Sequence, residues 1–543
     1  MSTSQDRAQL LKAQGNTLHE KGEHQAAYEK YSEAIKEDPN NAVFYANRAA
    51  SSLALKEFLD AAHDAEKATK LDPTYAKAWA RLANAAQGLG AWAKCFDAWE
   101  SALACIPSQD LTPSQKALKG QFREGLKASK LAEANPPPPS RLVAVPAGRR
   151  GNMANLPWVR AAKLEKKILA AQEQSSAIII LYASRTFERG VKNMKSTVKR
   201  YINGELAVEG IPNAIEAMSN GILIDRRCFV MDRDWGEQYM EQVKFEGEYY
   251  QAWGKGGSKT VCEQAPNRIK VEGWSSVGPA LCMTVRLWIM QGFLSGSTGS
   301  QGVAAEHFRN ALDVIEWGRN TWKDIPREDR GDIFDITFMR SVRRLFVAAV
   351  MDWVAMNDPE CEYTPQDAAK FAHEMIQEMD LNTPERTNEA QYHPSHPGYY
   401  AASWAYPHAD ALGVLGWFHL ELSKKAKNQE DEKIHLSAAA RYYMQAAEAY
   451  PEDDEFHPYF MSIALDAFLR HGTPLRHTLP ICKRIRLAIK KVMKIWEFSA
   501  MHKRRDVALQ QVLDWERGAH KGILMGTFTL ADHVGLEFEV TRG

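Results

Sequence analysis

The sequence predicts an all-α protein built from stacked helical repeats, and three observations support this fold class. Residues 8–107 repeat themselves with a period of 34 positions. A proline run at 135–140 separates these repeats from the rest of the chain. Beyond that run, apolar residues recur at helical spacing in several long segments, and the repeat pattern returns once near residue 440.

Three sets of residues coincide when the chain is shifted by 34 positions. Two sets are small side chains, which suit places where two antiparallel helices approach closely. The third set is proline, which cannot continue a helix and therefore ends each unit. Each unit has an apolar face that only a neighbour can cover, so such repeats occur in groups of three or more. The sets are Ala27, Ala61 and Cys95; Ala34, Ala68 and Ala102; and Pro39, Pro73 and Pro107.

A further helix is expected from about 113 to 134, directly after the third repeat. Thr112 is a typical N-cap residue, Pro113 suits the first helical turn, and Gln115 completes a capping box. This helix would cover the apolar face that the third repeat leaves bare. The proline run that follows predicts a stiff spacer in polyproline geometry.

The first copy of the repeat carries Gly15, Ala27, Tyr31, Ala34 and Pro39, and with this signature residues 8–107 resemble three tetratricopeptide repeats. The resemblance implies a solenoid of three helical pairs whose first helices line a concave surface. The second repeat departs from the family pattern at three positions but keeps its alanines and its proline. The departures are at Ala49, Ser52 and Ala65.

Five polar or cationic residues lie on the first helices of the three repeats: Lys12, Asn16, Asn47, Lys77 and Arg81. Residues four apart share one face of a helix, so Lys12 lies beside Asn16 and Lys77 lies beside Arg81. Two cations at this spacing repel each other by ~0.2–0.5 kcal/mol, and an external carboxylate can offset that cost through charge-assisted hydrogen bonds. The alternative interpretation is a set of solvated charges on an exposed helix face.

These five positions resemble the dicarboxylate clamp of tetratricopeptide co-chaperones. The resemblance implies binding to the Glu-Glu-Val-Asp tail of the seventy- and ninety-kilodalton heat-shock proteins. Lys12, Asn16 and Asn47 would hold the main-chain carboxylate, and Lys77 and Arg81 would bind side-chain and backbone oxygens further along. We therefore expect a co-chaperone or adaptor whose C-terminal helical region binds a client or a second partner. The alternatives are a generic scaffold for non-chaperone peptides and, less favoured, an enzyme with an unrecognised catalytic domain in 157–543.

The pattern divides the chain into four segments. They are a repeat domain with the clamp at 1–134, a Pro/Gly-rich linker at 135–156, a mainly helical region without an assigned role at 157–300, and a degenerate helical-repeat domain at 301–543. In the last segment, a second-helix signature like that of the N-terminal repeats is formed by Ala439, Tyr443, Ala446 and Pro451.

Within the two larger segments, helices are expected at 303–322, 333–356, 365–379, 411–426 and 456–470, with an insert at 428–432 and a flexible loop at 296–300. Strand-like composition would allow a small sheet, and it occurs at 178–180, 222–231, 268–274 and 536–541.

Composition narrows the class of protein. The chain has 543 residues, 68 Lys plus Arg and 68 Asp plus Glu, so its formal net charge is zero and predicts neither nucleic acid nor membrane as a partner. The seven cysteines form no CxxC pair, which favours a reducing compartment. The N-terminus lacks an apolar signal core, and no segment approaches the ~20 uninterrupted apolar residues of a membrane span. We expect a cytoplasmic protein.

Two segments superficially resemble sites for a phosphate or a metal. In Gly254–Thr260, Ser258 precedes Lys259, so the Gly-Lys-Ser/Thr ending of a phosphate loop is absent and a mobile surface loop is favoured. His393, His396 and His408 lie among prolines without acidic or thiol partners at metal-ligand spacing, which favours a proline-structured loop. We expect no catalytic residue, no metal site and no cofactor.

One segment is strongly basic. Residues 483–505 hold nine Lys or Arg and a single acid, Glu497. The same segment carries an apolar stripe at helical spacing, formed by Ile485, Ile489, Val492 and Trp496. Such a helix can contact anionic lipid or nucleic acid. The favoured interpretation is that the stripe is core and that the charges are solvated.

Overall fold

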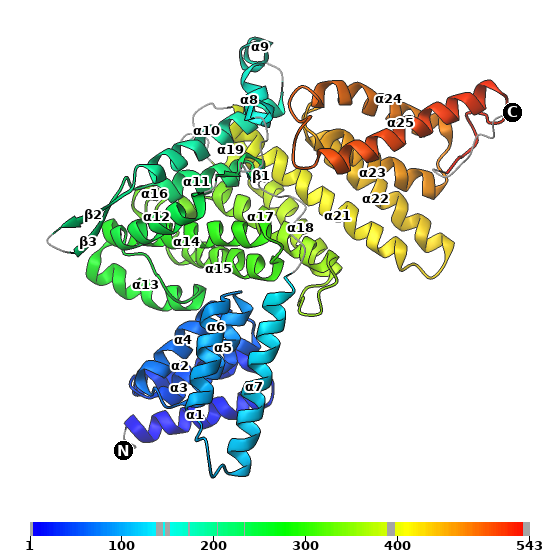
Figure 1. Ribbon diagram of the computed structural model, residues 1–543. Coiled ribbons are helices and arrows are strands. Elements are labelled where there is room, and N and C mark those ends of the chain that lie inside the picture. The colour runs from blue at the N-terminus through cyan, green and yellow to red at the C-terminus, as the bar shows by residue number, and fades with distance from the viewer. Residues whose placement is uncertain are drawn as a thin grey trace. The chain divides into compact units, whose positions relative to one another are not determined.

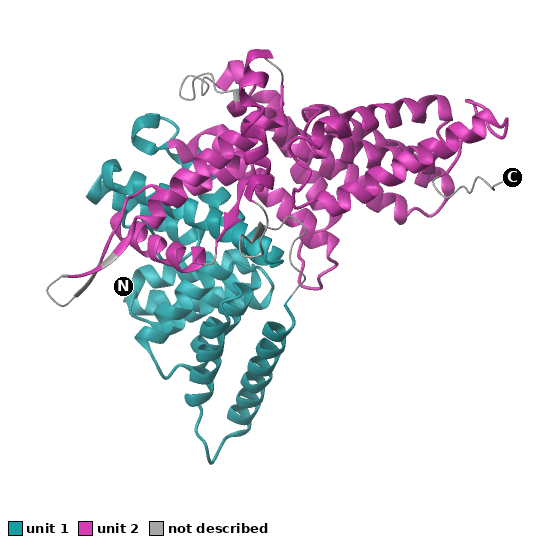
Figure 2. Cartoon of the chain, turned by 45° about the horizontal axis from the view of Figure 1, so that its top comes forward, with its two compact units in different colours: residues 1–139, 250–331 teal, residues 140–249, 332–543 magenta. Residues whose placement is uncertain are grey.

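The chain forms two compact units, each built from two stretches of sequence (Figure 2). The computed structural model describes residues 4–136, 145–146, 153–171, 174–202, 205–232, 234–387 and 397–535. Unit 1 comprises Met1–Pro139 and Tyr250–Gly331, and unit 2 comprises Ser140–Tyr249 and Asp332–Gly543. The four segments expected from the sequence do not correspond one to one to these two units, since each unit joins stretches from different segments. The division into four segments therefore stays a prediction.

Unit 1 begins with three antiparallel helical pairs and a long seventh helix, as predicted (Figure 1). The seventh helix starts at the expected Pro113, and its capping box is formed: Gln115 N donates to Thr112 Oγ1 at 3.3 Å, and Thr112 N donates to Gln115 Oε1 at 3.0 Å. The helices are α1 (Ser4–Glu20), α2 (His24–Glu37), α3 (Ala42–Ala54), α4 (Phe58–Leu71), α5 (Ala76–Gly88), α6 (Trp92–Ala104) and α7 (Pro113–Ala134).

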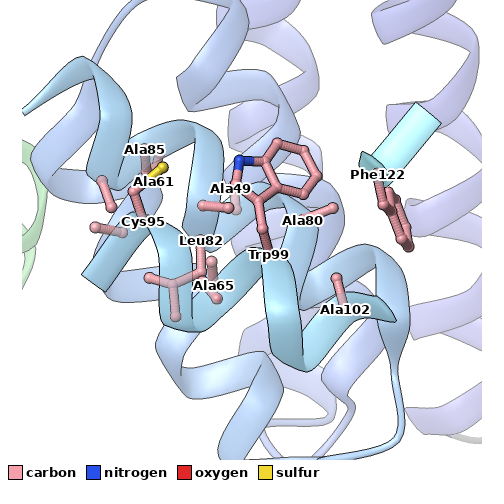
Figure 3. Close-up of a cluster of buried hydrophobic side chains, with 14 of the residues drawn as sticks. Ala49, Ala61, Ala65, Ala80, Leu82, Ala85, Cys95, Trp99, Ala102 and Phe122 are labelled. Carbon is pink, nitrogen blue, oxygen red and sulfur yellow. The ribbon is translucent and has the colours of Figure 1, made fainter. Parts of the chain in front are cut away.

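The repeat core is made of small side chains gathered around a few large ones, as Figure 3 shows for the second and third repeats. Trp99 of α6 lies among alanines and meets Phe122 of α7, with ring centroids 5.8 Å apart. All six small residues of the two periodic sets are fully buried. The predicted roles of the small residues and of the capping helix are therefore confirmed.

The second stretch of unit 1 is also helical, and here two expectations were wrong. Residues 268–274, expected to be strand-like, lie mainly in a helix, and the expected loop at 296–300 begins only after Ser297 because the preceding helix continues to that residue. The elements are α13 (Ser258–Glu272), α14 (Trp274–Ser297), α15 (Gln301–Thr321) and α16 (Arg327–Arg330). Among the described residues, α14 alone is long and apolar enough to cross a membrane, but 72% of its most apolar window is buried, as in a core helix.

Unit 2 is mainly helical. Its first stretch contains α8 (Pro157–Ala162), α9 (Glu165–Ala171), α10 (Ser176–Lys195), α11 (Ala214–Ile224) and α12 (Trp235–Tyr249). Its second stretch contains α17 (Ile336–Ala355), α18 (Pro365–Leu381), α19 (Pro384–Thr387), α20 (Pro397–Tyr400), a π-helical turn Ala401–Ala405, α21 (Tyr406–Lys424), α22 (Gln429–Ala449), α23 (Phe456–His471), α24 (Leu475–Val492) and α25 (His502–Leu524). The five helices expected between 303 and 470 are all present, α15 in unit 1 and the others here.

Strands in unit 2 are few and mostly lie where they were not expected. β2 (Val198–Ile202) and β3 (Glu205–Glu209) form an antiparallel hairpin, and β1 (Val145–Pro146) pairs in parallel with β4 (Val230–Met231). Residues 178–180 lie in α10, residues 222–224 end α11, and the segment 536–541 lies outside the described residues. The expected insert at 428–432 is instead the N-cap and first turn of α22, where Asn428 Oδ1 accepts a bond from Asp431 N at 2.9 Å.

The repeat signature expected near residue 440 is present in three dimensions. In the first repeat, a Cβ atom on Gly15 would lie 2.7 Å from the ring of Tyr31, so only glycine permits this close approach of α1 and α2. On α21, a Cβ atom on Gly416 would also lie 2.7 Å from the ring of Tyr443 on α22. The same glycine–tyrosine contact in both units confirms a second helical pair of the same kind.

Candidate ligand-binding face

The five predicted residues lie on the first helices of the three repeats, as expected. Lys12 and Asn16 are on α1, Asn47 is on α3, and Lys77 and Arg81 are on α5. The structure connects three of them directly: Asn47 Nδ2 donates to Asn16 Oδ1 at 3.2 Å, and Arg81 Nη1 donates to Asn47 Oδ1 at 3.4 Å. We call these five residues the polar row.

The hydrogen bonds within the polar row occupy the side-chain oxygens of its two asparagines and leave N–H groups available to a ligand. Asn16 Oδ1 accepts from Asn47 and also from the hydroxyl group of Tyr31, at 2.8 Å. Two donors at one oxygen fix the orientation of the Asn16 amide, so its NH₂ group remains to donate. The carbonyl oxygen of Asn47 is likewise occupied by Arg81. The row therefore offers N–H groups and positive charge to a ligand, which is the chemistry that an anion requires.

The two lysines of the polar row have no carboxylate partner among the described residues. Within the part of the chain that the structure describes, neither Lys12 nor Lys77 forms an ion pair, whereas Lys30 on the neighbouring helix α2 pairs with Glu33 at 2.8 Å. Arg81 has no carboxylate partner there either, and burial lowers the pKa of its guanidinium while the Tyr75 and Tyr31 hydroxyls partly offset this effect. The positive charge of the row is therefore not compensated within the described structure.

Sequence reasoning missed two contributors to this face. From the sequence, Tyr31 was named only as part of the repeat signature, yet its hydroxyl group orients Asn16. One turn after Asn16, His19 Nδ1 lies 3.1 Å from Ser51 Oγ and 3.2 Å from His24 Nδ1. Burial lowers the pKa of His19, and the neighbouring His24 and Arg81 lower it further. The spacing of His19 from Asn16, three positions along one helix, was the signal that could have found it.

The segment Gly254–Thr260 is not a mobile surface loop, because its backbone binds a carboxylate of this same unit. Asp60 of α4 is 3% exposed and accepts bonds from Gly257 N at 3.0 Å, Lys259 N at 3.2 Å and Thr260 N at 2.9 Å. The N-terminus of a helix attracts negative charge, and Asp60 supplies it to α13. The segment thus binds an anion through its backbone N–H groups, as a phosphate loop does, but the anion is the carboxylate of Asp60.

The histidine cluster expected to be a proline-structured loop is only partly described. His393 and His396 lie outside the described residues, and His408 lies on α21, where burial lowers its pKa. Across the described ranges, no group of three or more His, Cys, Asp or Glu side chains is placed to hold a metal ion.

Comparisons with known proteins agree with the first repeats. No protein-family model matches the chain. Small glutamine-rich tetratricopeptide repeat-containing protein 2 of Saccharomyces cerevisiae is 34% identical over 151 residues, which is 28% of this chain and 43% of that protein. The Hsp70-Hsp90 organizing protein of Triticum aestivum is 39% identical over 130 residues, which is 24% of this chain and 21% of that protein. The chain thus spans less than half the length of either relative.

Solved structures give matches of two extents. The Sgt2 TPR domain from Aspergillus fumigatus is 29% identical, with a TM-score of 0.21, and the match covers 26% of this chain and 93% of that one. The match to yeast Tom70 covers 96% of this chain and 98% of that one, at 14% identity and a TM-score of 0.25. The curated relatives confirm the resemblance of the first quarter of the chain to tetratricopeptide-repeat co-chaperones.

Proposed function

We propose that this protein is a cytoplasmic adaptor that binds the C-terminal Glu-Glu-Val-Asp tail of a heat-shock chaperone, of the seventy- or ninety-kilodalton class, through the polar row. The observation that carries the proposal is a row of donors and cations on three adjacent helices, with its acceptors already used. The names of the sequence relatives, among them an Hsp70-Hsp90 organizing protein, indicate the class of partner.

The C-terminus of a peptide supplies the carboxylate oxygens that the donors and cations of this row can bind. In the proposed complex, Lys12 and the free donors of Asn16 and Asn47 hold the terminal carboxylate. Lys77 and Arg81 bind the side-chain carboxylate of the last aspartate and backbone oxygens before it. The bonds from Tyr31 and Asn47 already hold the Asn16 amide in place, so less side-chain entropy is lost when the peptide binds.

The remaining helices would serve the adaptor role rather than catalysis. We infer that the C-terminal helical region binds a client or a second partner, which the chaperone tail brings close to the chaperone. The affinity expected for the tail is in the micromolar range, about −8 kcal/mol, so the complex would form and dissociate readily.

The test is isothermal titration calorimetry of the full chain with a peptide ending in Glu-Glu-Val-Asp and with the same peptide amidated at its C-terminus. The free acid is expected to bind, and the amide is expected to lose most of the affinity. Lys77→Ala and Arg81→Ala should each abolish measurable binding. Lys30→Ala is the matched control, because Lys30 is a lysine of the same repeats that already has a partner in Glu33.

Circular dichroism of each variant shows whether the repeats remain folded. Equal affinity for the acid and the amide would contradict the carboxylate clamp and favour a generic peptide scaffold. Unchanged binding in both Lys77→Ala and Arg81→Ala would remove the polar row from the site altogether.

A further inference from the structure

The basic helix α24 has one face in the core of unit 2, as predicted. Ile485 and Val492 are fully buried, and Trp496 just beyond the helix is buried too. The helix contains no acidic residue. Its other faces therefore present only cations and a few apolar side chains, and the question is which of these cations have partners within unit 2.

The cations at the two edges of the exposed face are paired. Arg484 Nη1 lies 3.1 Å from Glu448, and Lys491 Nζ lies 2.5 Å from Glu452, so acids at the end of α22 neutralise one edge. On the other edge, Arg486 bonds to Glu516 of α25 at 3.2 Å. These three carboxylates pair with cations at the edges of the exposed face, not with those along its centre.

The centre of the exposed face has cations that no described carboxylate pairs with, although Arg476 Nε donates a hydrogen bond to His477 Nε2 at 3.1 Å. At 3.6 residues per turn, the side chains from Arg476 to Lys490 that point along this centre fall within an arc of about 80° and along a length of about 21 Å. Lys494 follows in the turn after the helix, which ends at Val492. No ion pair to these cations occurs among the described residues. We call this set the basic stripe, and it consists of Arg476, Pro480, Lys483, Leu487, Lys490 and Lys494, of which all six are exposed.

Apolar side chains accompany the basic stripe. Leu487 lies at its centre and is 51% exposed. At its end, Phe498 is 44% exposed, and the guanidinium of Arg160 from α8 lies 5.3 Å from the Phe498 ring centroid. Arg160 also donates to the carbonyl oxygen of Lys494 at 3.0 Å, which places α8 at this end of the stripe.

The geometry points to a docking surface for an anionic lipid bilayer. Lysines without a carboxylate partner along one face of α24 match a plane of negative headgroups. The exposed leucine between them and the phenylalanine at the end of the stripe can enter the boundary of the acyl chains. Nucleic acid would use the lysines equally, but the apolar side chain at the centre of the stripe is a leucine, which offers no flat ring on which a base could stack. The Phe498 ring at the end of the stripe already carries the Arg160 guanidinium. The inference concerns unit 2 and is independent of the proposed peptide site.

The experiment is co-sedimentation of the full chain with vesicles of phosphatidylcholine alone and with vesicles in which about a third of the lipid is phosphatidylserine. The chain should sediment only with the anionic vesicles, and salt should weaken the binding. The triple variant Lys483→Glu/Lys490→Glu/Lys494→Glu should reduce binding at least tenfold, and Leu487→Ser should reduce it a few-fold.

The matched control reverses three exposed cations on α7 of unit 1: Lys116→Glu/Arg123→Glu/Lys127→Glu. It changes the net charge by the same amount, so binding within twofold of the unmodified chain is expected. Equal losses in both triple variants would overturn the proposal, because net charge alone would explain them. Binding of a single-stranded RNA oligomer through the stripe, without vesicle binding, would also overturn it and assign the surface to nucleic acid.

Discussion

Asn47 and Arg48 are adjacent on α3, but their side chains belong to two different surfaces of the repeats. Asn47 lies in the polar row, whose lysines and arginine have no carboxylate partner in the described structure. Arg48 points to the other side and is 6% exposed. Its Nε and Nη2 atoms bond to both oxygens of Asp64, at 2.7 and 2.8 Å. In the described structure, α3 thus contributes to one surface whose cations have no carboxylate partner and to another surface whose charges are paired, which makes it the compensated surface.

The compensated surface, which we call the back face, is formed by charged residues of α3 and α4, by Glu57 just before α4, and by the segment 255–263. Asp60 binds the N-terminus of α13, Lys259 pairs with Glu57 at 2.7 Å, and Arg48 reaches Glu263 at 3.4 Å. A buried charge must be paired, whereas cations that water reaches stay available to an anionic ligand. Substitutions on the back face should therefore change stability, and substitutions in the polar row should change peptide binding.

The largest effect is expected for Asp64→Ala. It would leave the Arg48 guanidinium buried without its bidentate partner, and the free energy of unfolding should fall by about 3–5 kcal/mol. Denaturant unfolding followed by circular dichroism measures this loss. The double variant Arg48→Met/Asp64→Leu should recover most of it, since both charges are then absent. A loss below about 1 kcal/mol in Asp64→Ala would contradict the assignment of the pair to stability.

The next effect is expected for Asp60→Ala, which removes the acceptor for three backbone N–H groups at the start of α13. The expected loss is ~1.5–3 kcal/mol, because these groups would be left buried without a partner. Hydrogen exchange should speed up first at residues 257–260. Peptide affinity should stay within twofold of the unmodified chain, and a larger change would show that the two surfaces are coupled.

A pH effect is expected from Glu57, whose pKa burial raises to about 7, although the bond from Lys259 opposes the rise. A raised carboxyl pKa means that the folded state binds the proton more tightly than the unfolded state does. Stability from this group is therefore greatest below the unfolded pKa of about 4.5 and is lost as pH rises to about 7. Glu57→Gln should flatten the decline between pH 5 and 7.5 by ~1–3 kcal/mol in thermal unfolding. An identical pH profile would remove Glu57 as its source.

The smallest effect is expected for Tyr31→Phe in the polar row. The variant keeps the ring that packs against Gly15 but deletes the hydroxyl group that orients Asn16. Peptide affinity should fall by ~0.5–1.5 kcal/mol in calorimetry, with little change in the unfolding midpoint. The opposite result, a stability loss without a binding loss, would place Tyr31 with the back face.

The first seven helices and the positions of the polar row could be predicted because the signals are local. The capping box at Thr112 and the proline that ends each unit depend on residues within one or two turns, and the repeat compares positions only 34 residues apart. The same signature located Tyr443 in unit 2, whereas Gly416, its contact on α21, was not singled out in the sequence. The β2–β3 hairpin was missed although the sequence carries a signal for it: Asn-Gly at 203–204, the dipeptide typical of a two-residue hairpin turn, stands between its two strands.

By itself, the sequence determined the repeat, its register and the residue types that line one face of the first helices. Only the tertiary structure decided which charges are satisfied, since that depends on partners far away along the chain. Asp60 meets the backbone of 257–260 almost two hundred residues later, which turns an apparent phosphate loop into a structural contact. No such partner reaches the polar row within the described residues, so its cations remain for a ligand. The periodicity of the sequence indicates which face of a helix a side chain is on. The free-energy cost of its charge depends on which groups of the folded chain contact it.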